Sequence, residues 1–470
     1  MKKPTVILSA LAAVYSALIA WWLFGTRPAA ADLQLPGSDN RPANLARSAD
    51  EVRVGEFFIR YADEPSNLKG SWPRFRGSDF SNIVARDNLA EMPAGGFPQV
   101  WSFTTGEGYA APAIHSGRVY VLDYDEALSS DMLRCFALES GKELWRRWYR
   151  VPMKRNHGFS RTIPHVDEKY IVTMGPKGHV MCLETATGKL LWSLDTEKEY
   201  ETEMPPWYTG QCPLVDEGEL ILAAGGAKAL LAGINLQTGK EAWRTPNPNG
   251  YKMSHSSVIP MTVGGKRFYF YMAVGAMCGV SAEAADKGQL LFAEAKWQPS
   301  VVAPSPLLLP NNRVLLVAGY GAGGAVLEIA RSGNGLTATT ISQHKAGGGI
   351  SCEQQTPIFF KNMVITIMPK DGGAHRSRLV CYAADNFSTP VWSSGGDERF
   401  GLGPYMVIGG KLLALEDEGS LFVYKVEPRK LTLVGRQKVI DGVDAWGPLA
   451  YADGYLLLRD AHRVVCLKVR

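Results

Sequence analysis

Large polar and aromatic residues gather just before a proline that recurs along the chain. The clearest cases precede Pro164, Pro213, Pro260, Pro357 and Pro448. The candidate ligand-binding residues are His157, Arg161, Trp207, Tyr208, Gln211, His255, Glu353, Gln354, Asp444 and Trp446. Aromatic faces combined with a few hydrogen-bonding groups are what a pocket for a planar or peptide-like ligand needs. The sequence predicts such a site where the fold brings these segments together; the alternative is that the same side chains plug a channel and satisfy one another.

Patterns typical of hydrolases and metal sites do not accompany these residues. His255 stands between two serines, but neighbours in a strand point to opposite faces of a sheet. The eight histidines show no HxxxH or HExxH spacing, and the seven cysteines form no CxxC pair. Four acidic residues of the first repeat lack the glycine and the spacing of a calcium loop: Asp123, Asp125, Glu126 and Asp131. We therefore predict a solvated loop there, and no catalytic or metal site.

Charge and cysteine usage exclude other classes of function. The formal net charge is only +4, without the clustered lysine and arginine of a nucleic-acid-binding surface. Four of the seven cysteines occupy the same slot of the repeat described below. Equivalent positions in different repeats lie too far apart for a disulfide, so we predict free cysteines buried as small hydrophobic residues.

A repeat ending in tryptophan supplies the framework that must position the candidate residues. Each copy reads as a strand, a tight turn and a short apolar strand, as in residues 182–192. The turn glycines are Gly141, Gly188 and Gly239, and the tryptophans are Trp101, Trp145, Trp192 and Trp243, with Trp392 in a later, drifted copy. The first four tryptophans recur about every 44 to 51 residues, which for strand-only contents is typical of a β-propeller. We predict that these glycines and tryptophans dock neighbouring blades.

Eight repeat units can be counted, so we predict an all-β, eight-bladed propeller with four-stranded blades. The last unit ends at residues 464–469 without a tryptophan strand of its own, whereas a surplus strand, residues 99–102, precedes the first unit. Pairing the N-terminal Trp101 strand with the last blade would close the ring and leave no unpaired interface.

The repeats resemble those of eight-bladed quinoprotein alcohol dehydrogenases and of the outer-membrane assembly lipoprotein BamB. The shared element is T-G-K-x-x-W, present at Thr187–Trp192. The segment Trp72–Gly77, with the sequence WPRFRG, is similar to the opening signature of exported PQQ-binding-like propellers. The resemblance covers residues 72–470 and implies the fold, but one scaffold carries both dehydrogenases and non-catalytic binders.

The resemblance also implies what a dehydrogenase site would contain. The quinoprotein pattern has a disulfide between adjacent cysteines, a tryptophan across the quinone, Ca²⁺ held by carboxylate and amide groups, and an aspartate base. This sequence has no adjacent cysteines. We therefore expect a non-catalytic binding or scaffold module without a cofactor. The alternatives are a PQQ-dependent or quinone-linked oxidoreductase with an altered site, using PQQ and Ca²⁺, and a carbohydrate-binding propeller that stacks sugars on Trp207, Tyr208 and Trp446.

The N-terminal region predicts export. Lys2 and Lys3 precede an uncharged run, residues 5–25, long enough to span a membrane. We expect residues 1–31 to be a retained signal anchor or a signal peptide cleaved near Ala29–Ala31, residues 32–70 a tether with a short strand at 56–59, and residues 71–470 the propeller. The predicted location is the periplasmic face of the cytoplasmic membrane. The expected partners are cell-envelope proteins or peptide segments, with no nucleic acid, and the expected state is a monomer.

Overall fold

The computed structural model describes residues 13–14, 16–18 and 52–470. The chain separates into two compact units, Met1–Asp50 and Glu51–Arg470. Most of the predicted anchor and the first part of the predicted tether lie outside the described residues. Within the part of the chain that the structure describes, no helix is long and apolar enough to cross a membrane.

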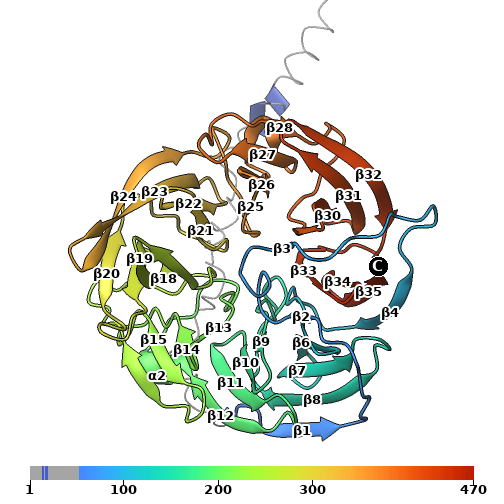
Figure 1. Cartoon of the computed structure of the whole chain (residues 1–470), viewed down its shortest axis with the longest axis vertical. Helices are drawn as coiled ribbons and strands as arrows, with labels where there is room; N and C mark the ends of the chain where they lie inside the picture. Colours follow the sequence, from blue (N-terminus) through green and yellow to red (C-terminus); the bar gives the residue numbers. More distant parts are fainter. Residues whose placement is uncertain (1–12, 15, 19–51) are drawn as a thin grey trace, which may run out of the picture. The chain divides into compact units, whose positions relative to one another are not determined.

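The second unit is a ring of eight antiparallel sheets, which confirms the predicted propeller and its blade number (Figure 1). The first blade contains β5 (Ala113–His115), β6 (Arg118–Asp125), β7 (Ser130–Ala137) and β8 (Glu143–Arg150), and the second contains β9 (His165–Val166), β10 (Tyr170–Met174), β11 (His179–Glu184) and β12 (Leu190–Asp195). The third contains β13 (Leu214–Asp216), β14 (Glu219–Leu222), β15 (Ala232–Asn235) and β16 (Glu241–Arg244), and the fourth contains β17 (Ile259–Val263), β18 (Lys266–Ala273), β19 (Ala276–Ser281) and β20 (Leu290–Glu294).

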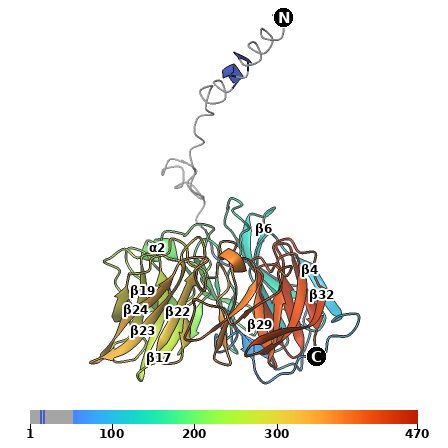
Figure 2. The same ribbon diagram turned by 90° about the horizontal axis from the view of Figure 1, so that it is seen from above.

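The remaining four blades follow the same order, and Figure 2 shows their strands from the side. The fifth blade contains β21 (Leu307–Leu309), β22 (Arg313–Ala318), β23 (Gly323–Ser332) and β24 (Gly335–His344), and the sixth contains β25 (Ile358–Phe360), β26 (Met363–Ile367), β27 (Leu379–Ala383) and β28 (Trp392–Ser393). The seventh contains β29 (Tyr405–Ile408), β30 (Lys411–Leu415), β31 (Ser420–Glu427) and β32 (Lys430–Lys438), and the eighth contains β33 (Gly447–Ala452), β34 (Tyr455–Arg459), β35 (Arg463–Lys468) and β4 (Gln99–Thr104). Two short helical segments, α2 (Thr196–Tyr200) and η2 (Gly373–His375), connect strands.

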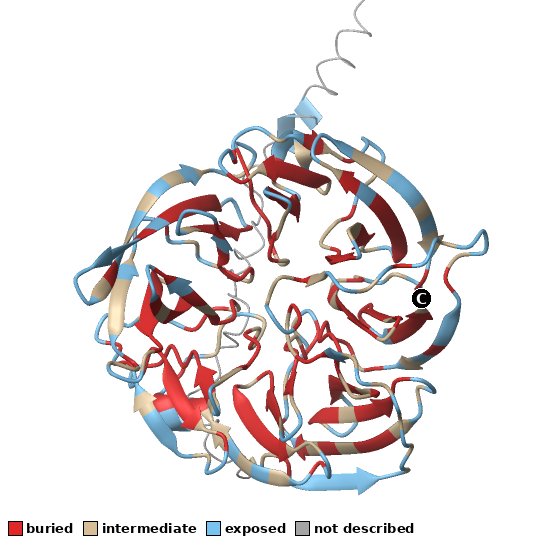
Figure 3. Ribbon diagram, viewed as in Figure 1, coloured by how far each residue is buried: buried red, intermediate tan, exposed pale blue. Residues whose placement is uncertain are grey.

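The hydrophobic core lies between adjacent blades, where the two middle strands of each sheet are buried on both faces (Figure 3). In the second blade, β10 and β11 are runs of apolar and β-branched residues and are almost fully buried. Such continuous apolar runs suit strands that are covered on both faces. The outermost strands, such as β12, alternate between half-buried and exposed residues because one side faces solvent. All seven cysteines are buried and free, as predicted.

The ring closes through the N-terminal strand, as the sequence predicted. Strand β4 pairs antiparallel with β35, with Trp101 opposite Cys466. The indole of Trp101 packs on Gly141 of the first blade, where an added Cβ would come 2.5 Å from Trp101 Cγ. Trp101 Nε1 also donates a hydrogen bond to the Leu138 carbonyl at 2.8 Å. The first and eighth blades are therefore joined by one sheet and one docked side chain.

The same docking repeats between later blades. Trp145 lies against Gly188, and Trp192 lies against Gly239 with its Nε1 donating to the Leu236 carbonyl at 2.7 Å. Each turn glycine has a positive φ, which a glycine adopts without steric cost. Trp243 continues the series on Gly288, whereas Nε1 of Trp392 is buried without a partner.

Two segments that precede Trp101 add three strands to the propeller: residues 57–60 form one strand and residues 71–84 contain two. Strand β1 (Phe57–Arg60), close to the strand predicted at 56–59, pairs with β8 on the outside of the first blade. Strand β2 (Ser71–Trp72) pairs with β5, the innermost strand of that blade, and β3 (Ile83–Val84) pairs in parallel with β29 of the seventh. The chain between β2 and β3 therefore crosses the centre of the ring, as Figure 1 shows. We call residues 71–84 the crossing segment.

Arg76 holds the crossing segment in the channel. Its side chain is 5% exposed and its guanidinium donates to four backbone carbonyls. Two belong to the segment itself, Phe80 and Ser81, and two to the sixth blade, Thr356 and Pro357, at 2.7 to 3.2 Å. Burial lowers the pKa of Arg76 to about 10, so the side chain is charged at neutral pH. One buried cation thus ties the crossing segment to the far side of the ring.

The predicted solvated acidic loop of the first blade is wrong for Asp123 and Asp131, whereas Glu126 lies exposed in the turn between β6 and β7. Strands β6 and β7 extend through this region, and Asp123 and Asp131 are only 4% and 1% exposed. Asp123 forms an ion pair with Arg134 at 3.0 Å, and Asp131 accepts a hydrogen bond from the Tyr149 hydroxyl at 2.8 Å. The polar sequence suggested that the strands end before these residues. The strands extend through them because both carboxylates have polar partners inside the blade.

Asp131 should make the stability of the propeller pH-dependent. Burial raises its pKa from 3.8 to about 7, although the Tyr149 hydrogen bond opposes this shift. The folded state therefore holds a proton that the unfolded state has lost, and stability should fall as pH rises from about 4 to about 7. Asp131→Asn removes this carboxyl group and with it the pH dependence. The free energy of unfolding of the variant minus that of the native protein should therefore be larger at pH 8 than at pH 5, by about 2–4 kcal/mol.

Urea unfolding at the two pH values measures this difference. Asp125→Asn, on the same strand pair but partly exposed, serves as the control and should change the pH dependence little. Equal pH profiles for native protein and Asp131→Asn would contradict the assignment.

Candidate functional site

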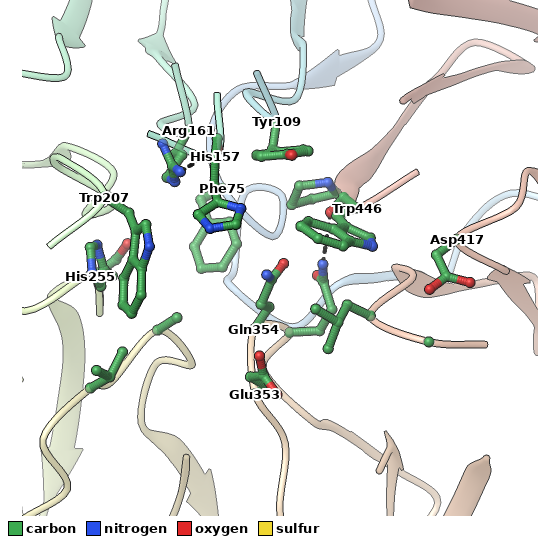
Figure 4. Close-up of a pocket in the computed structure, with 18 of the residues that line it drawn as sticks. Phe75, Tyr109, His157, Arg161, Trp207, His255, Glu353, Gln354, Asp417 and Trp446 are labelled. Carbon is green, nitrogen blue, oxygen red and sulfur yellow. Dashed lines mark hydrogen bonds between the residues drawn. The ribbon is translucent and has the colours of Figure 1, made fainter. Parts of the chain in front are cut away.

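A cavity of about 610 Å³ lies on the propeller axis (Figure 4). Its wall is built from the loops that lead into the innermost strand of every blade. One or more residues from each of the eight loops contribute, beginning with Tyr109 in the first blade and ending with Trp446 and Pro448 in the eighth. Phe75 of the crossing segment also lines it. The repeat therefore converts eight separate segments of the sequence into one site.

Seven of the ten residues proposed from the sequence line this cavity. They are His157, Arg161, Trp207, His255, Glu353, Gln354 and Trp446. The other three do not. Tyr208 donates its hydroxyl to the Lys154 carbonyl at 2.6 Å, Gln211 is buried and pairs with the backbone of Ala223, and Asp444 lies 3.5 Å from the Tyr109 hydroxyl behind the wall. Binding of a ligand by the seven remains a prediction.

Two aromatic pairs form opposite walls. Trp207 stacks on Tyr320 with ring centroids 5.9 Å apart, and Tyr109 stacks on Trp446 at 5.0 Å. Figure 4 shows Trp207 on one side of the cavity and Trp446 on the other, with Phe75 between them. Offset stacking of this kind fixes the rings and presents flat apolar surface at little cost in conformational freedom. The walls suit a flat or aromatic group.

The charged groups of the cavity have no partners of opposite charge. The Arg161 guanidinium donates to the carbonyls of residues 156–159, and no described carboxylate pairs with it. Burial lowers its pKa to about 10, which leaves it charged at neutral pH. Glu353 is 7% exposed and forms no ion pair with any described residue; burial raises the pKa of its carboxyl.

Two ring nitrogens at the cavity are buried without a hydrogen-bond partner: His255 Nδ1 and Trp446 Nε1. Burial, together with the nearby Arg161 charge, lowers the pKa of His255 to about 4. The imidazole is therefore neutral at neutral pH. It rests against Gly210, where an added Cβ would lie 2.8 Å from the Cβ of His255. These two groups can contribute hydrogen bonds to a bound molecule.

Several lining residues were missed by sequence reasoning: Phe75, Tyr109, Tyr320, Lys370 and Asp417. Phe75 belongs to the WPRFRG segment, whose conspicuous aromatic composition was a usable signal. Tyr109 precedes a proline, like the predicted residues, and could have been found by the same rule. Tyr320, Lys370 and Asp417 lie in loops between the second and third strands of their blades, which the proline pattern does not mark.

The residues present do not fit PQQ held by Ca²⁺ in the quinoprotein arrangement. No three acidic, histidine or cysteine residues among the described residues come together to hold a metal ion. The seven cysteines are unpaired and buried. The donor set can therefore bind an organic molecule but lacks the calcium site.

Comparisons with known proteins agree with this architecture. A family described as outer membrane protein assembly factor BamB matches residues 129–372. The dehydrogenase subunit of a quinone-type alcohol dehydrogenase from Gluconacetobacter polyoxogenes is 25% identical over 233 residues. That match covers 46% of this chain and 30% of the relative, so the chain spans under a third of the relative's length.

Solved structures share the fold at low sequence identity. BamB from Moraxella catarrhalis has a TM-score of 0.52 at 11% identity, covering 79% of this chain and 99% of that one. A europium-containing methanol dehydrogenase scores 0.55 at 14% identity, covering 83% and 89%. The quinohemoprotein alcohol dehydrogenase ADHIIG from Pseudomonas putida HK5 scores 0.57 at 12%, covering 87% and 83%. Both a BamB and dehydrogenases are thus similar in fold.

Proposed function

Because the chain belongs to the family of outer membrane protein assembly factor BamB, we propose that it is a binding module of the bacterial cell envelope whose ligand occupies the axial cavity. In this proposal the N-terminal region holds the propeller at the periplasmic face of the cytoplasmic membrane. The propeller acts as a monomer without catalysing a reaction, and its partners are peptide segments or proteins of the envelope.

The observation that supports this proposal most is the cavity itself. All eight blades contribute to it and its walls carry two fixed aromatic pairs. It also contains two charged groups without an ion-pair partner among the described residues, Arg161 and Glu353, and two ring nitrogens without a hydrogen-bond partner. A concave, mostly apolar site with a few convergent polar groups is the usual form of a ligand site. Side chains that only plugged the channel would be expected to satisfy one another.

Ligand-dependent thermal stability tests the proposal. Purified protein is screened against peptides, oligosaccharides and PQQ with Ca²⁺, and Trp446→Ala is compared with Tyr61→Ala, which removes an exposed ring outside the cavity. A ligand at 100 times its Kd stabilises the folded state by about 2.7 kcal/mol. We expect one class to raise the Tm of the native protein and of Tyr61→Ala but not of Trp446→Ala. Equal shifts in all three proteins would contradict binding in the cavity.

The alternative, a quinone-linked oxidoreductase, rests on the dehydrogenases among the similar proteins. PQQ and Ca²⁺ are added to the purified protein with an alcohol and an artificial electron-accepting dye. Our proposal predicts no saturable change in the quinone spectrum and no dye reduction. Saturable binding accompanied by dye reduction would replace our proposal with the oxidoreductase.

A further inference from the structure

The cavity is lined by two basic side chains, Arg161 and Lys370, and by two acidic ones, Glu353 and Asp417. Arg161 and Glu353 are the more buried member of each kind. Figure 4 shows Arg161 and Glu353 on opposite sides of the cavity, with Phe75 between them. Neither forms an ion pair with a described residue, although each is substantially buried. Buried charges are normally paired, because an unpaired charge loses its hydration without compensation. A ligand with opposite charges at its two ends would compensate both.

Arg161 is suited to a carboxylate. Its two terminal nitrogens donate to backbone carbonyls of residues 156–159, which fixes the plane of the guanidinium but leaves its positive charge uncompensated. Its Nε–H takes part in none of these bonds and remains as a donor. Charge-assisted hydrogen bonds from guanidinium to carboxylate are among the strongest available in proteins.

Glu353 is suited to an ammonium group. Its position is fixed by Gly319, where an added Cβ would lie 2.5 Å from Glu353 Cγ. The exposed Lys370 also lines the cavity but does not approach Glu353 closely enough to form an ion pair. An ammonium group of the ligand would stabilise the ionised carboxylate, as any nearby cation does.

The space between the two charges suits an aromatic side chain attached to a peptide backbone. The stacked pairs on either side offer flat apolar faces, and the unpartnered Nε1 of Trp446 can donate to a peptide carbonyl. The amide of Gln354 also faces the cavity and can both donate and accept (Figure 4). Pockets of about 300–1,000 Å³ are typical for molecules of this size, and the cavity lies within this range.

We propose that the axial cavity binds a short peptide with both termini free and an aromatic side chain, the carboxylate at Arg161 and the amino group at Glu353. This inference rests on the proposed function, since it names the ligand class of the same site. A protein tail is excluded by the proposal, because a tail presents only one free terminus to the cavity.

Isothermal titration with four probes tests the inference: Ala-Phe-Ala, its N-acetylated form, its C-amidated form, and Ala-Ala-Ala. We expect Ala-Phe-Ala to bind at least about tenfold more tightly than each of the other three. Glu353→Gln removes the partner of the amino group, so free and acetylated peptides should bind this variant with similar affinity. Glu168→Gln, the same substitution at an exposed residue that does not line the cavity, should leave the preference for the free amino group in place.

The outcomes are distinguishable. Equal binding of free and acetylated peptides by the native protein would overturn the inference in favour of a protein C-terminus. An undiminished preference in Glu353→Gln would overturn the assignment of the amino group. Absence of binding by all four probes would overturn the peptide class. In that last case the thermal screen still judges the proposed function. A protein segment whose Tm shift is lost in Trp446→Ala would uphold it, and an oligosaccharide that behaves in this way would replace it with the carbohydrate-binding alternative.

Discussion

Replacing Arg76 with methionine is expected to lower the free energy of unfolding by about 3–5 kcal/mol. Methionine fills a similar volume but cannot donate, so four carbonyls, two of them in fully buried hydrogen bonds, lose the guanidinium as a donor. Only the Thr356 carbonyl among them keeps another donor from the described residues, the Tyr405 hydroxyl at 3.3 Å. Unsatisfied buried acceptors cost more than the hydrogen bond itself contributes. The crossing segment should also detach from the sixth blade. Chemical denaturation monitored by tryptophan fluorescence measures the loss.

Arg74→Met is the matched control for this prediction. Arg74 lies in the same crossing segment, but it is only half-buried and donates one hydrogen bond, to the Val215 carbonyl at 3.3 Å. We expect a loss of about 1 kcal/mol or less. Similar losses in the two variants would show that the crossing segment is not held by Arg76.

Trp101→Ala is expected to have an effect of similar size, about 3–5 kcal/mol, typical of removing a buried tryptophan. The indole joins two blades that are distant in sequence, because it packs on Gly141 and donates to Leu138 while its strand completes the eighth sheet. Its removal leaves a void at the only place where the ring is closed by the N-terminal strand rather than by consecutive repeats. We therefore expect amide hydrogens of β4 and β35 to exchange faster than those of the other blades.

Trp392→Ala provides the comparison. This tryptophan is 9% exposed, close to the 8% of Trp101, but its Nε1 has no hydrogen-bond partner and its strand does not close the ring. Its replacement should cost less than that of Trp101 and should leave the exchange of β4 and β35 unchanged. Faster exchange spread evenly over all blades in Trp101→Ala would contradict the closure role.

Much of the fold was predictable because the residues that define the repeat are also the residues that pack one blade on the next. Each blade docks on the next through a tryptophan and a turn glycine, which explains the spacing of Trp145, Trp192 and Trp243. The surplus Trp101 strand could pair only with the last blade, which lacked a fourth strand. The crossing segment was not predictable in this way. Its path depends on contacts between Arg76 and the sixth blade, 280 residues away in sequence, which no local pattern records.

The candidate site was predictable where it follows the repeat and unpredictable where it does not. Residues upstream of each proline reach the axis because that is where the innermost strands begin, which accounts for Trp207 and Glu353. Tyr208, the neighbour of Trp207, does not line the cavity and instead donates its hydroxyl to the Lys154 carbonyl, a contact that no local pattern in the sequence indicates. Tyr320 lies in a loop that the proline pattern does not mark, and its part in the site is seen only in the structure, where it stacks on Trp207.

The central claim is that the axial cavity, and not the outer surface, receives the ligand. Fluorine NMR of protein labelled with 5-fluorotryptophan tests it most directly, with resonances assigned through Trp207→Phe and Trp446→Phe. On addition of Ala-Phe-Ala, we predict shifts in the signals of Trp207 and Trp446 and none in those of the docking residues Trp101 and Trp192. Shifts confined to Trp101, Trp192 or other tryptophans outside the cavity would contradict the account.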